Sequence, residues 1–369
     1  MYLKEITLLH FKNYAEASVS FSPKINCFTG ANGMGKTNLL DAIHYLSLCK
    51  SFSNSVDSQS ISFDQPFFMI QGKFEKEGRE EEVLVSLKRA QKKVVKRNKN
   101  EYEKLAEHIG AFPLVMISPM DTTLITGGGG ERRRFVDGII SQFDKRYLDK
   151  LIAYNAILQQ RNALLKQFAV SRSFDGALLE VLDEQIADTG NYVHEARIKF
   201  LTEFIPVFEK FYRLLSGNAE QVQLKYISSL QGKTYLEALK LSLHKDCAVE
   251  HTSVGVHRDD LNFLLGDNEV KKYASQGQQK TYLLALKLAQ YEYIKTKTGT
   301  KPILLLDDVY DKLDNKRFEQ LIALVSSNDF GQVFISDTSA ERILQLFTSN
   351  KGCFIFDIRK DGIKQLKGK

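Results

Sequence analysis

The stretch that decides the fold is Gly30-Ala31-Asn32-Gly33-Met34-Gly35-Lys36-Thr37. It matches the phosphate-loop pattern G-x-x-x-x-G-K-[ST], in which the glycines let backbone N–H groups face a phosphate. Lys36 is expected to neutralise the β- and γ-phosphates of a nucleotide, and Thr37 to ligate Mg²⁺. A short apolar strand, residues 25–28, precedes the loop, and helical spacing follows it over residues 36–50. This order predicts a nucleotide-binding α/β domain.

A second nucleotide-binding element is Ile303-Leu304-Leu305-Leu306-Asp307-Asp308. A buried strand that ends in two carboxylates is the Walker B pattern, and ligands of open α/β sheets bind at that edge. Asp307 is expected to hold the Mg²⁺ shell together with Thr37. Asp308 is expected to polarise the attacking water.

Between these elements, Ser275-Gln276-Gly277-Gln278 opens a predicted helix. A serine cap with free backbone N–H groups forms an anion site, although alone it is more typical of an ordinary helix cap. The order of phosphate loop, distant Ser-x-Gly-Gln and Walker B strand is the order of ATP-binding-cassette (ABC) ATPases. Ser275 therefore joins Lys36, Asp307 and Asp308 as a candidate catalytic residue.

The hydrophobic periodicity predicts three segments. Alternation from about residue 67 to 97 indicates an antiparallel β subdomain, and two long helical patterns lie between 140 and 215, the second with a kink at Pro206. We expect residues 1–137 and 251–369 to form one ATPase head, interrupted by an α-helical arm at 138–250. The predicted fold class is α/β, an ABC/SMC-type P-loop head.

Six groups of residues carry a more specific resemblance. They are Phe11-Lys12-Asn13-Tyr14, Ser118-Pro119 followed by Gly127 to Asp137, His257-Arg258-Asp259-Asp260-Leu261, Ser275 to Gln278, Leu305 to Val309, and Leu313-Asp314. With these groups in this order, the sequence resembles the RecF family of recombination-repair ATPases over nearly its whole length. This family is related to the heads of structural-maintenance-of-chromosomes (SMC) proteins.

The resemblance implies roles for particular residues. Lys12 and Asn13 would lie beside the nucleotide, and Ser275 with Gln278 would reach the γ-phosphate of ATP held by a second subunit. Leu313-Asp314 would cross that dimer seam. Ser336 or Asp337 would stand at the switch position, where many relatives carry His. That departure, and Asp308 where transporters have Glu, favour slow hydrolysis.

The resemblance also implies a function. An ATP-gated homodimer would bind single-stranded, gapped or junction DNA and would release it on hydrolysis. It would act with RecO and RecR in loading recombinase, in DNA replication, recombinational repair and the SOS response. ATP and Mg²⁺ are the implied cofactors.

Composition agrees with a soluble setting. The 369 residues carry a net charge of +6 and four scattered cysteines, with no apolar run long enough to span a membrane and no signal-peptide pattern at residue 1. We expect a reduced, cytoplasmic protein without membrane contact.

Two basic clusters and one histidine each leave two interpretations open. The seven basic residues from Lys88 to Lys99 are either a solvated hairpin face or a surface that follows DNA phosphates. Arg132-Arg133-Arg134 either line a nucleotide or DNA surface or pair with acidic residues in the lobe interface. His257 is either a hydrogen-bonding residue, which strand alternation favours, or a metal ligand.

Three rival functions differ in class. A metabolic or GTP-dependent P-loop enzyme lacks support because no N-K-x-D motif is present. A chromosome-organising SMC head is disfavoured because the insertion of about 110 residues is too short to form a long coiled-coil arm. A nuclease of the overcoming-lysogenisation type is disfavoured because too few residues follow the strand with the switch position, Ser336 or Asp337, to form a nuclease domain.

Overall fold

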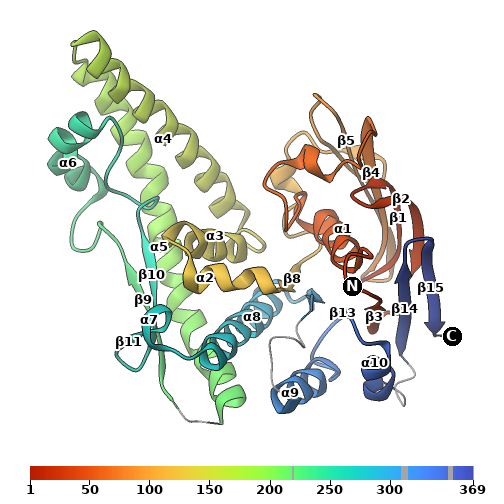
Figure 1. Cartoon of the computed structure of the whole chain (residues 1–369). Coiled ribbons are helices and arrows are strands. Elements are labelled where there is room, and N and C mark those ends of the chain that lie inside the picture. Colours follow the sequence, from red (N-terminus) through yellow and green to blue (C-terminus); the bar gives the residue numbers. More distant parts are fainter. Residues whose placement is uncertain (218–219, 309–314, 348–351, 369) are drawn as a thin grey trace. The chain divides into compact units, whose positions relative to one another are not determined.

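The computed structural model describes residues 1–217, 220–308, 315–347 and 352–368, and Figure 1 traces the whole chain. The chain divides into two compact units. Unit 1 holds Met1–Asp121 and Leu286–Lys369, and unit 2 holds Thr122–Ala285. From the sequence we expect residues 122–137 and 251–285 in the ATPase head, whereas both stretches belong to unit 2. The hydrophobic pattern of the sequence does not reveal these boundaries, because helix α3 (Gly129–Ile140) packs on strand β10 (Asp260–Leu265), which is far away in the sequence.

A six-stranded, mainly parallel sheet forms the nucleotide-binding half of unit 1. Its strand order is β15 (Gly362–Lys367), β14 (Cys353–Arg359), β3 (Ile25–Thr29), β13 (Val333–Asp337), β12 (Ile303–Leu306) and β8 (Leu114–Ile117). Only the edge strand β15 is antiparallel to its neighbour. The carboxyl ends of β3, β12 and β13 therefore meet at one edge, where ligands of α/β sheets bind.

A second sheet in unit 1 is antiparallel, as the alternating pattern predicted. Its order is β2 (Tyr14–Ser20), β1 (Tyr2–Phe11), β4 (Phe67–Lys76), β5 (Arg79–Lys88), β6 (Val94–Arg97) and β7 (Asn100–Glu101). Helix α1 (Lys36–Leu48) is buried on nearly every side, and its leucines join strands of both sheets in one hydrophobic core. The helix that follows the phosphate loop is thus fixed by packing from both sheets.

The remaining helices of unit 1 are short. The 3₁₀ turn η1 (Asp57–Ser60) lies between α1 and β4, and η2 (Leu105–Glu107) lies between β7 and β8. The turn η3 (Pro119–Thr122) follows β8, and its last residue opens unit 2. Helices α9 (Asn315–Val325) and α10 (Ala340–Phe347) follow β12 and β13. None of the described helices is long and apolar enough to cross a membrane.

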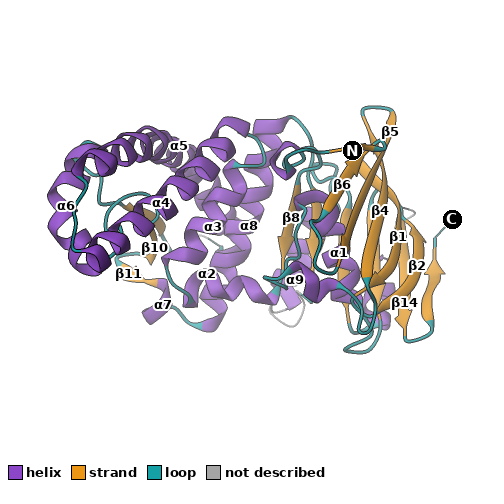
Figure 2. Cartoon of the chain, turned by 90° about the horizontal axis from the view of Figure 1, so that it is seen from above, coloured by secondary structure: helices purple, strands orange, loops and turns teal. Residues whose placement is uncertain are grey.

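Unit 2 is mostly helical (Figure 2). Its elements are α2 (Thr123–Thr126), α3 (Gly129–Ile140), α4 (Lys145–Ser171), α5 (Gly176–Ser216), β9 (Val222–Ile227), α6 (Tyr235–Val249), β10 (Asp260–Leu265), β11 (Asn268–Glu269) and α7 (Val270–Tyr273). Helix α8 (Gln276–Thr298) begins in unit 2 and ends in unit 1. The two long helices predicted from the sequence are α4 and α5, and Pro206 lies inside a continuous α5.

Buried ion pairs hold the helical unit together. The Arg161 side chain on α4 is fully buried, and it binds Asp183 on α5 and Asp246 on α6 at 2.6 and 2.8 Å. Arg197 on α5 likewise binds Asp137 and Asp259. Because a buried charge without its partner is strongly unfavourable, these arginines fix the helices against one another.

Candidate nucleotide-binding site

The phosphate loop curls as its sequence requires. Gly30 has φ 138° and Gly35 has φ 114°, a region that side chains rarely adopt. A Cβ atom at Gly30 would lie 2.4 Å from the Ile358 carbonyl oxygen, and one at Gly35 would lie 2.5 Å from Asn13 Nδ2. Gly35 caps α1 without a side-chain hydrogen bond. The first N–H groups of α1 are thus presented as an anion site, which fits a nucleotide phosphate.

Lys36 is held inside this curl. Its side chain is buried, and its Nζ donates to the carbonyl oxygens of Gly30 at 2.8 Å and Ala31 at 3.1 Å. The ammonium is therefore held at the phosphate loop by carbonyl oxygens of the loop itself.

Three polar side chains meet at the carboxyl edge of the sheet. Thr37 Oγ1 donates to Asp307 Oδ1 at 3.0 Å, and Ser336 Oγ donates to the same oxygen at 2.7 Å. The Asp308 N–H donates to Ser336 Oγ at 2.9 Å. Burial raises the pKa of Asp307, although the hydrogen bonds from Ser336 and Thr37 act in the opposite direction. A hydroxyl beside a carboxylate is an oxygen pair suited to Mg²⁺.

The two candidates for the switch position have different surroundings. Ser336 contacts both Walker B aspartates, through the Asp307 carboxylate and the Asp308 N–H. Asp337 is buried and pairs instead with Arg342 at 3.0 Å, and it also accepts from the Ser339 N–H. Of the two, Ser336 is the one whose side chain reaches the Walker B carboxylate.

Lys12 and Asn13 approach the phosphate loop in different ways. Asn13 Nδ2 donates to the Met34 carbonyl oxygen at 3.0 Å, so Asn13 lies directly against the loop. Lys12 Nζ lies 2.6 Å from Asp41 Oδ2 and 2.6 Å from Ser53 Oγ. The Lys12 charge is therefore matched by a buried carboxylate of α1.

Sequence reasoning missed Asp41 and Arg342. Both lie in helices that start just after a motif. The partner of Asp41 precedes β2 and β3 in the sequence, and the partner of Arg342 is the last residue of β13. An acidic residue on the apolar helix after the loop was the one available signal for Asp41. Leu313-Asp314, expected at a dimer seam, lie outside the described residues.

Ser275 lies in unit 2, immediately before α8. The Ser275 N–H donates to Gln278 Oε1 at 2.7 Å, and Ser275 Oγ accepts from the Gln278 N–H at 3.3 Å. This reciprocal pair is a capping box, and it leaves the Ser275 side chain exposed. The serine is therefore a helix cap, as its sequence predicted, and it stands at the protein surface.

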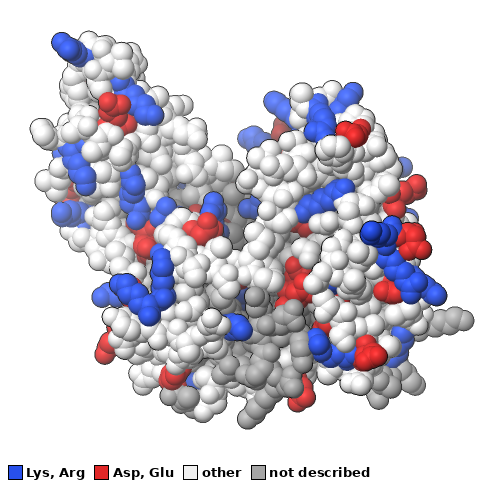
Figure 3. All heavy atoms as spheres, in the orientation of Figure 1, with Lys and Arg blue, Asp and Glu red and all other residues white. Residues whose placement is uncertain are grey.

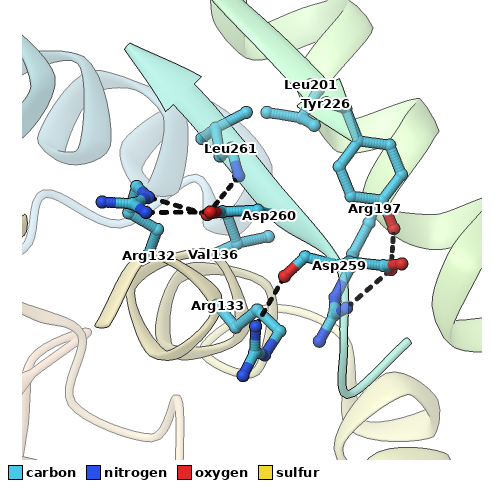
Figure 4. Close-up of a pocket in the computed structure, with 9 residues that line it drawn as sticks. All are labelled: Arg132, Arg133, Val136, Arg197, Leu201, Tyr226, Asp259, Asp260 and Leu261. Atoms are coloured by element: carbon cyan, nitrogen blue, oxygen red, sulfur yellow. Dashed lines mark hydrogen bonds and ion pairs between the residues drawn. The ribbon is translucent and has the colours of Figure 1, made fainter. Parts of the chain in front are cut away.

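The arginine cluster pairs with acidic residues inside unit 2 (Figure 4). Arg132 binds Asp260 through two contacts of 2.7 and 2.9 Å, and Arg133 donates to the Asp259 carbonyl oxygen at 2.6 Å. Burial acts to raise the pKa of Asp260, but the hydrogen bonds from Arg132 prevail and the pKa lies below its usual value. Arg134 pairs with Glu131. The pairing with acidic residues agrees with the second interpretation, but all of these partners lie within unit 2 rather than in a lobe interface.

His257 makes hydrogen bonds on both ring nitrogens. Nε2 lies 3.0 Å from the Thr252 carbonyl oxygen, which only accepts, so Nδ1 accepts from the Tyr154 hydroxyl at 2.6 Å. Burial lowers the pKa of His257 to about 4. The ring is therefore neutral and structural, in agreement with the hydrogen-bonding interpretation.

Comparisons with known proteins agree with this geometry. The family model described as the RecF/RecN/SMC N terminal domain matches residues 2–355. The DNA replication and repair protein RecF of Parabacteroides distasonis is 49% identical over 368 residues, 100% of each chain. The protein of the same name from Phocaeicola vulgatus is 51% identical over 346 residues, 93% of this chain and 92% of that one. The chain belongs to the RecF family.

Solved structures confirm the predicted fold class. A structure of the recombination mediator protein RecF with ATP, in the RecFOR pathway, has a TM-score of 0.90 and 32% identity, and the match covers 99% of this chain and 98% of that one. An Smc head domain from Pyrococcus furiosus has a TM-score of 0.57 at 16% identity over 99% of this chain and 96% of that one. The latter likeness concerns the fold alone. The RecF family fold is thus an ABC/SMC-type ATPase head.

Replacing Gly35 by alanine tests the phosphate loop. Because the new Cβ would be strained at φ 114° and would meet Asn13, we expect ATP affinity to fall about 10-fold or more. Gly128→Ala is the control, since its added Cβ has nothing within 4 Å. Calorimetric titration with ATP measures both, and equal affinities would contradict this geometry.

The low pKa of His257 predicts acid sensitivity. The unfolded chain takes up this proton below about pH 6.5 and the folded chain only near pH 4, so folding stability is lost as the pH falls between these values, by up to about 3 kcal/mol. His257→Gln keeps a neutral donor and acceptor, and should flatten this loss in urea unfolding experiments. The exposed His244→Gln should not; a His257→Gln profile identical to that of the wild type would refute the prediction.

Proposed function

We propose that this chain is a RecF-type ATPase that binds ATP, Mg²⁺ and DNA in DNA replication and recombinational repair. The observation that carries the proposal is the Thr37–Asp307–Ser336 cluster beside a glycine loop that holds Lys36. The identity of 49–51% to proteins named for DNA replication and repair supports the biological role.

The residues fit MgATP in distinct roles. The loop N–H groups from residues 30–37 and Lys36 would bind the β- and γ-phosphates, and Asn13 would lie at the side of the loop. Thr37 and Asp307 would hold Mg²⁺, which neutralises developing phosphate charge when bound. Asp308 would orient the attacking water. Lys12 would act on the nucleotide through α1, since its ammonium contacts Asp41 of that helix.

The site is expected to be completed by a second copy of the chain. Ser275 is exposed and caps the N-terminus of a 23-residue helix, so its hydroxyl and nearby N–H groups suit a γ-phosphate. If ATP held by one protomer meets Ser275 of another, ATP favours the dimer because it contacts both chains. Hydrolysis would remove those contacts and release the dimer and its DNA.

The DNA surface is proposed to include the β5–β6 hairpin. Lys93 and Arg97 of this segment are paired with Asp57 and Glu81. Lys88, Lys92 and Lys99 are instead exposed. Figure 3 shows Lys and Arg side chains on the upper part of unit 1, over the antiparallel sheet, among fewer acidic ones. Exposed lysines suit the phosphates of single-stranded, gapped or junction DNA.

The partners and setting follow from the relatives. RecO and RecR are proposed because a solved RecF structure 32% identical to this chain belongs to the RecFOR pathway. Recombinase loading at gaps and the SOS response are proposed from the resemblance to the RecF family. A reduced cytoplasmic location fits the free cysteines at 27, 49, 247 and 353.

Ser275→Arg tests the role of a second subunit. We expect this variant to bind ATP like the wild type, because the phosphate loop lies in unit 1, but to remain monomeric with ATP, since a bulky cation replaces the contact to the neighbouring phosphate. Light scattering with gel filtration reports mass, and calorimetry reports ATP affinity. A variant that dimerises with ATP as the wild type does would contradict the assignment.

Reversing two exposed charges tests the DNA surface. Lys88→Glu with Lys92→Glu should weaken DNA binding about 10-fold and reduce the slope of log K against log salt by about 1 to 2, since phosphate contacts are lost. Lys360→Glu with Lys364→Glu reverses the same charge elsewhere in unit 1, where both lysines are exposed. Fluorescence anisotropy over a salt series measures both variants. If the hairpin variant and the control have the same slope, the basic residues of the hairpin are a solvated face and do not bind DNA.

A further inference from the structure

The capping box at Ser275 depends on the orientation of one amide. Gln278 Oε1 accepts from the Ser275 N–H, and the Gln278 N–H donates to Ser275 Oγ. Ser275 Oγ is thereby used as an acceptor, and its hydrogen is available to donate outward. Whatever fixes the Gln278 side chain also fixes the direction of that hydroxyl.

Glu220 fixes the other end of the amide. Gln278 Nε2 donates to Glu220 Oε1, and the Tyr212 hydroxyl donates to Glu220 Oε2 at 2.8 Å. A carboxylate only accepts and a backbone N–H only donates, so the amide is correct in one orientation alone. If the Gln278 amide were flipped, its oxygen would face the Glu220 carboxylate, and its NH₂ group would face the Ser275 N–H.

This chain of contacts begins in the long helix α5. Tyr212 is fully buried on α5, where its ring packs near Phe208 and Tyr282. Glu220 lies just before β9 and is half-buried. Tyr212, Glu220, Gln278 and Ser275 all belong to unit 2, and they lead from the buried face of α5 to the surface serine.

We propose that Glu220 is a positioning residue for Ser275. Through Gln278 it holds the serine turn in the form that a phosphate of a second protomer would meet, while Tyr212 holds Glu220. This role rests on the proposed function of Ser275. Gln278 would likewise act through Ser275, because its amide oxygen and its amide nitrogen both form hydrogen bonds within unit 2.

Glu220→Gln is the sharpest test, because it keeps the shape and replaces one acceptor by a donor. If the N–H group of the new amide faces Gln278 Nε2, that contact is lost. If it faces the Tyr212 hydroxyl, which can accept, Gln278 Nε2 keeps only a weaker hydrogen bond to a neutral amide oxygen. With ATPγS, we expect the dimer dissociation constant to rise about 10-fold, or about 1.4 kcal/mol. The ATP affinity of the isolated protomer and the melting temperature should match the wild type.

Glu209→Gln is the matched control. Like Glu220→Gln, this substitution removes one negative charge, in this case from α5. Glu209 also lines the same groove as Glu220. No hydrogen bond from Glu209 to Gln278 is found in the described residues, so its dimerisation should be that of the wild type. Sedimentation velocity with ATPγS measures all three chains.

The outcomes separate this role from the function on which it rests. If wild type dimerises and Glu220→Gln does so equally, the positioning role is wrong while the proposed function stands. If wild type stays monomeric with ATPγS, the proposed function fails and this role fails with it. If Glu220→Gln lowers the melting temperature, Tyr212→Phe decides: weakened dimerisation supports the role, and unchanged dimerisation overturns it.

Discussion

One carboxylate oxygen organises the nucleotide-binding edge. Asp307 Oδ1 accepts from Thr37 and from Ser336, and Ser336 in turn accepts from the Asp308 N–H. The contact therefore joins α1, the end of β12 and the end of β13. A site built this way is held by rigid elements, an arrangement that suits the Mg²⁺ and triphosphate proposed to bind there.

The glycine loop adds a constraint of a different kind. At Gly30 and Gly35 the neighbouring chain leaves no room for a side chain, and the backbone takes positive φ values. The loop approaches the β14 backbone on one side and Asn13 on the other. Its curvature therefore depends on a residue from the first turn of the chain and on one of its last strands, so both segments of unit 1 contribute to the loop.

The sequence predicted those parts that local pattern controls. The phosphate loop, the Walker B strand, the Ser275 cap, the antiparallel sheet and the paired helices α4 and α5 each follow from spacing and residue type. The unit boundaries did not, because residues 122–137 pack on β10, more than a hundred residues away. The Lys12–Asp41, Asp337–Arg342 and Glu220–Gln278 contacts were not predicted either, although these partners lie closer together in the sequence. A polar side chain whose partner lies on another element leaves no period in the sequence, so only the folded chain reveals these contacts.

The two units divide the expected chemistry between them, with the phosphate loop in one and Ser275 in the other. One chain's loop is proposed to work with another chain's serine. Mixing Lys36→Ala with Ser275→Arg tests this directly, since one mixed pair contains a single intact loop facing a single intact serine. With ATP, each variant alone should remain monomeric, and the mixture should form a dimer that hydrolyses ATP. A mixture that stays monomeric and inactive, although the wild type dimerises, would contradict this shared site.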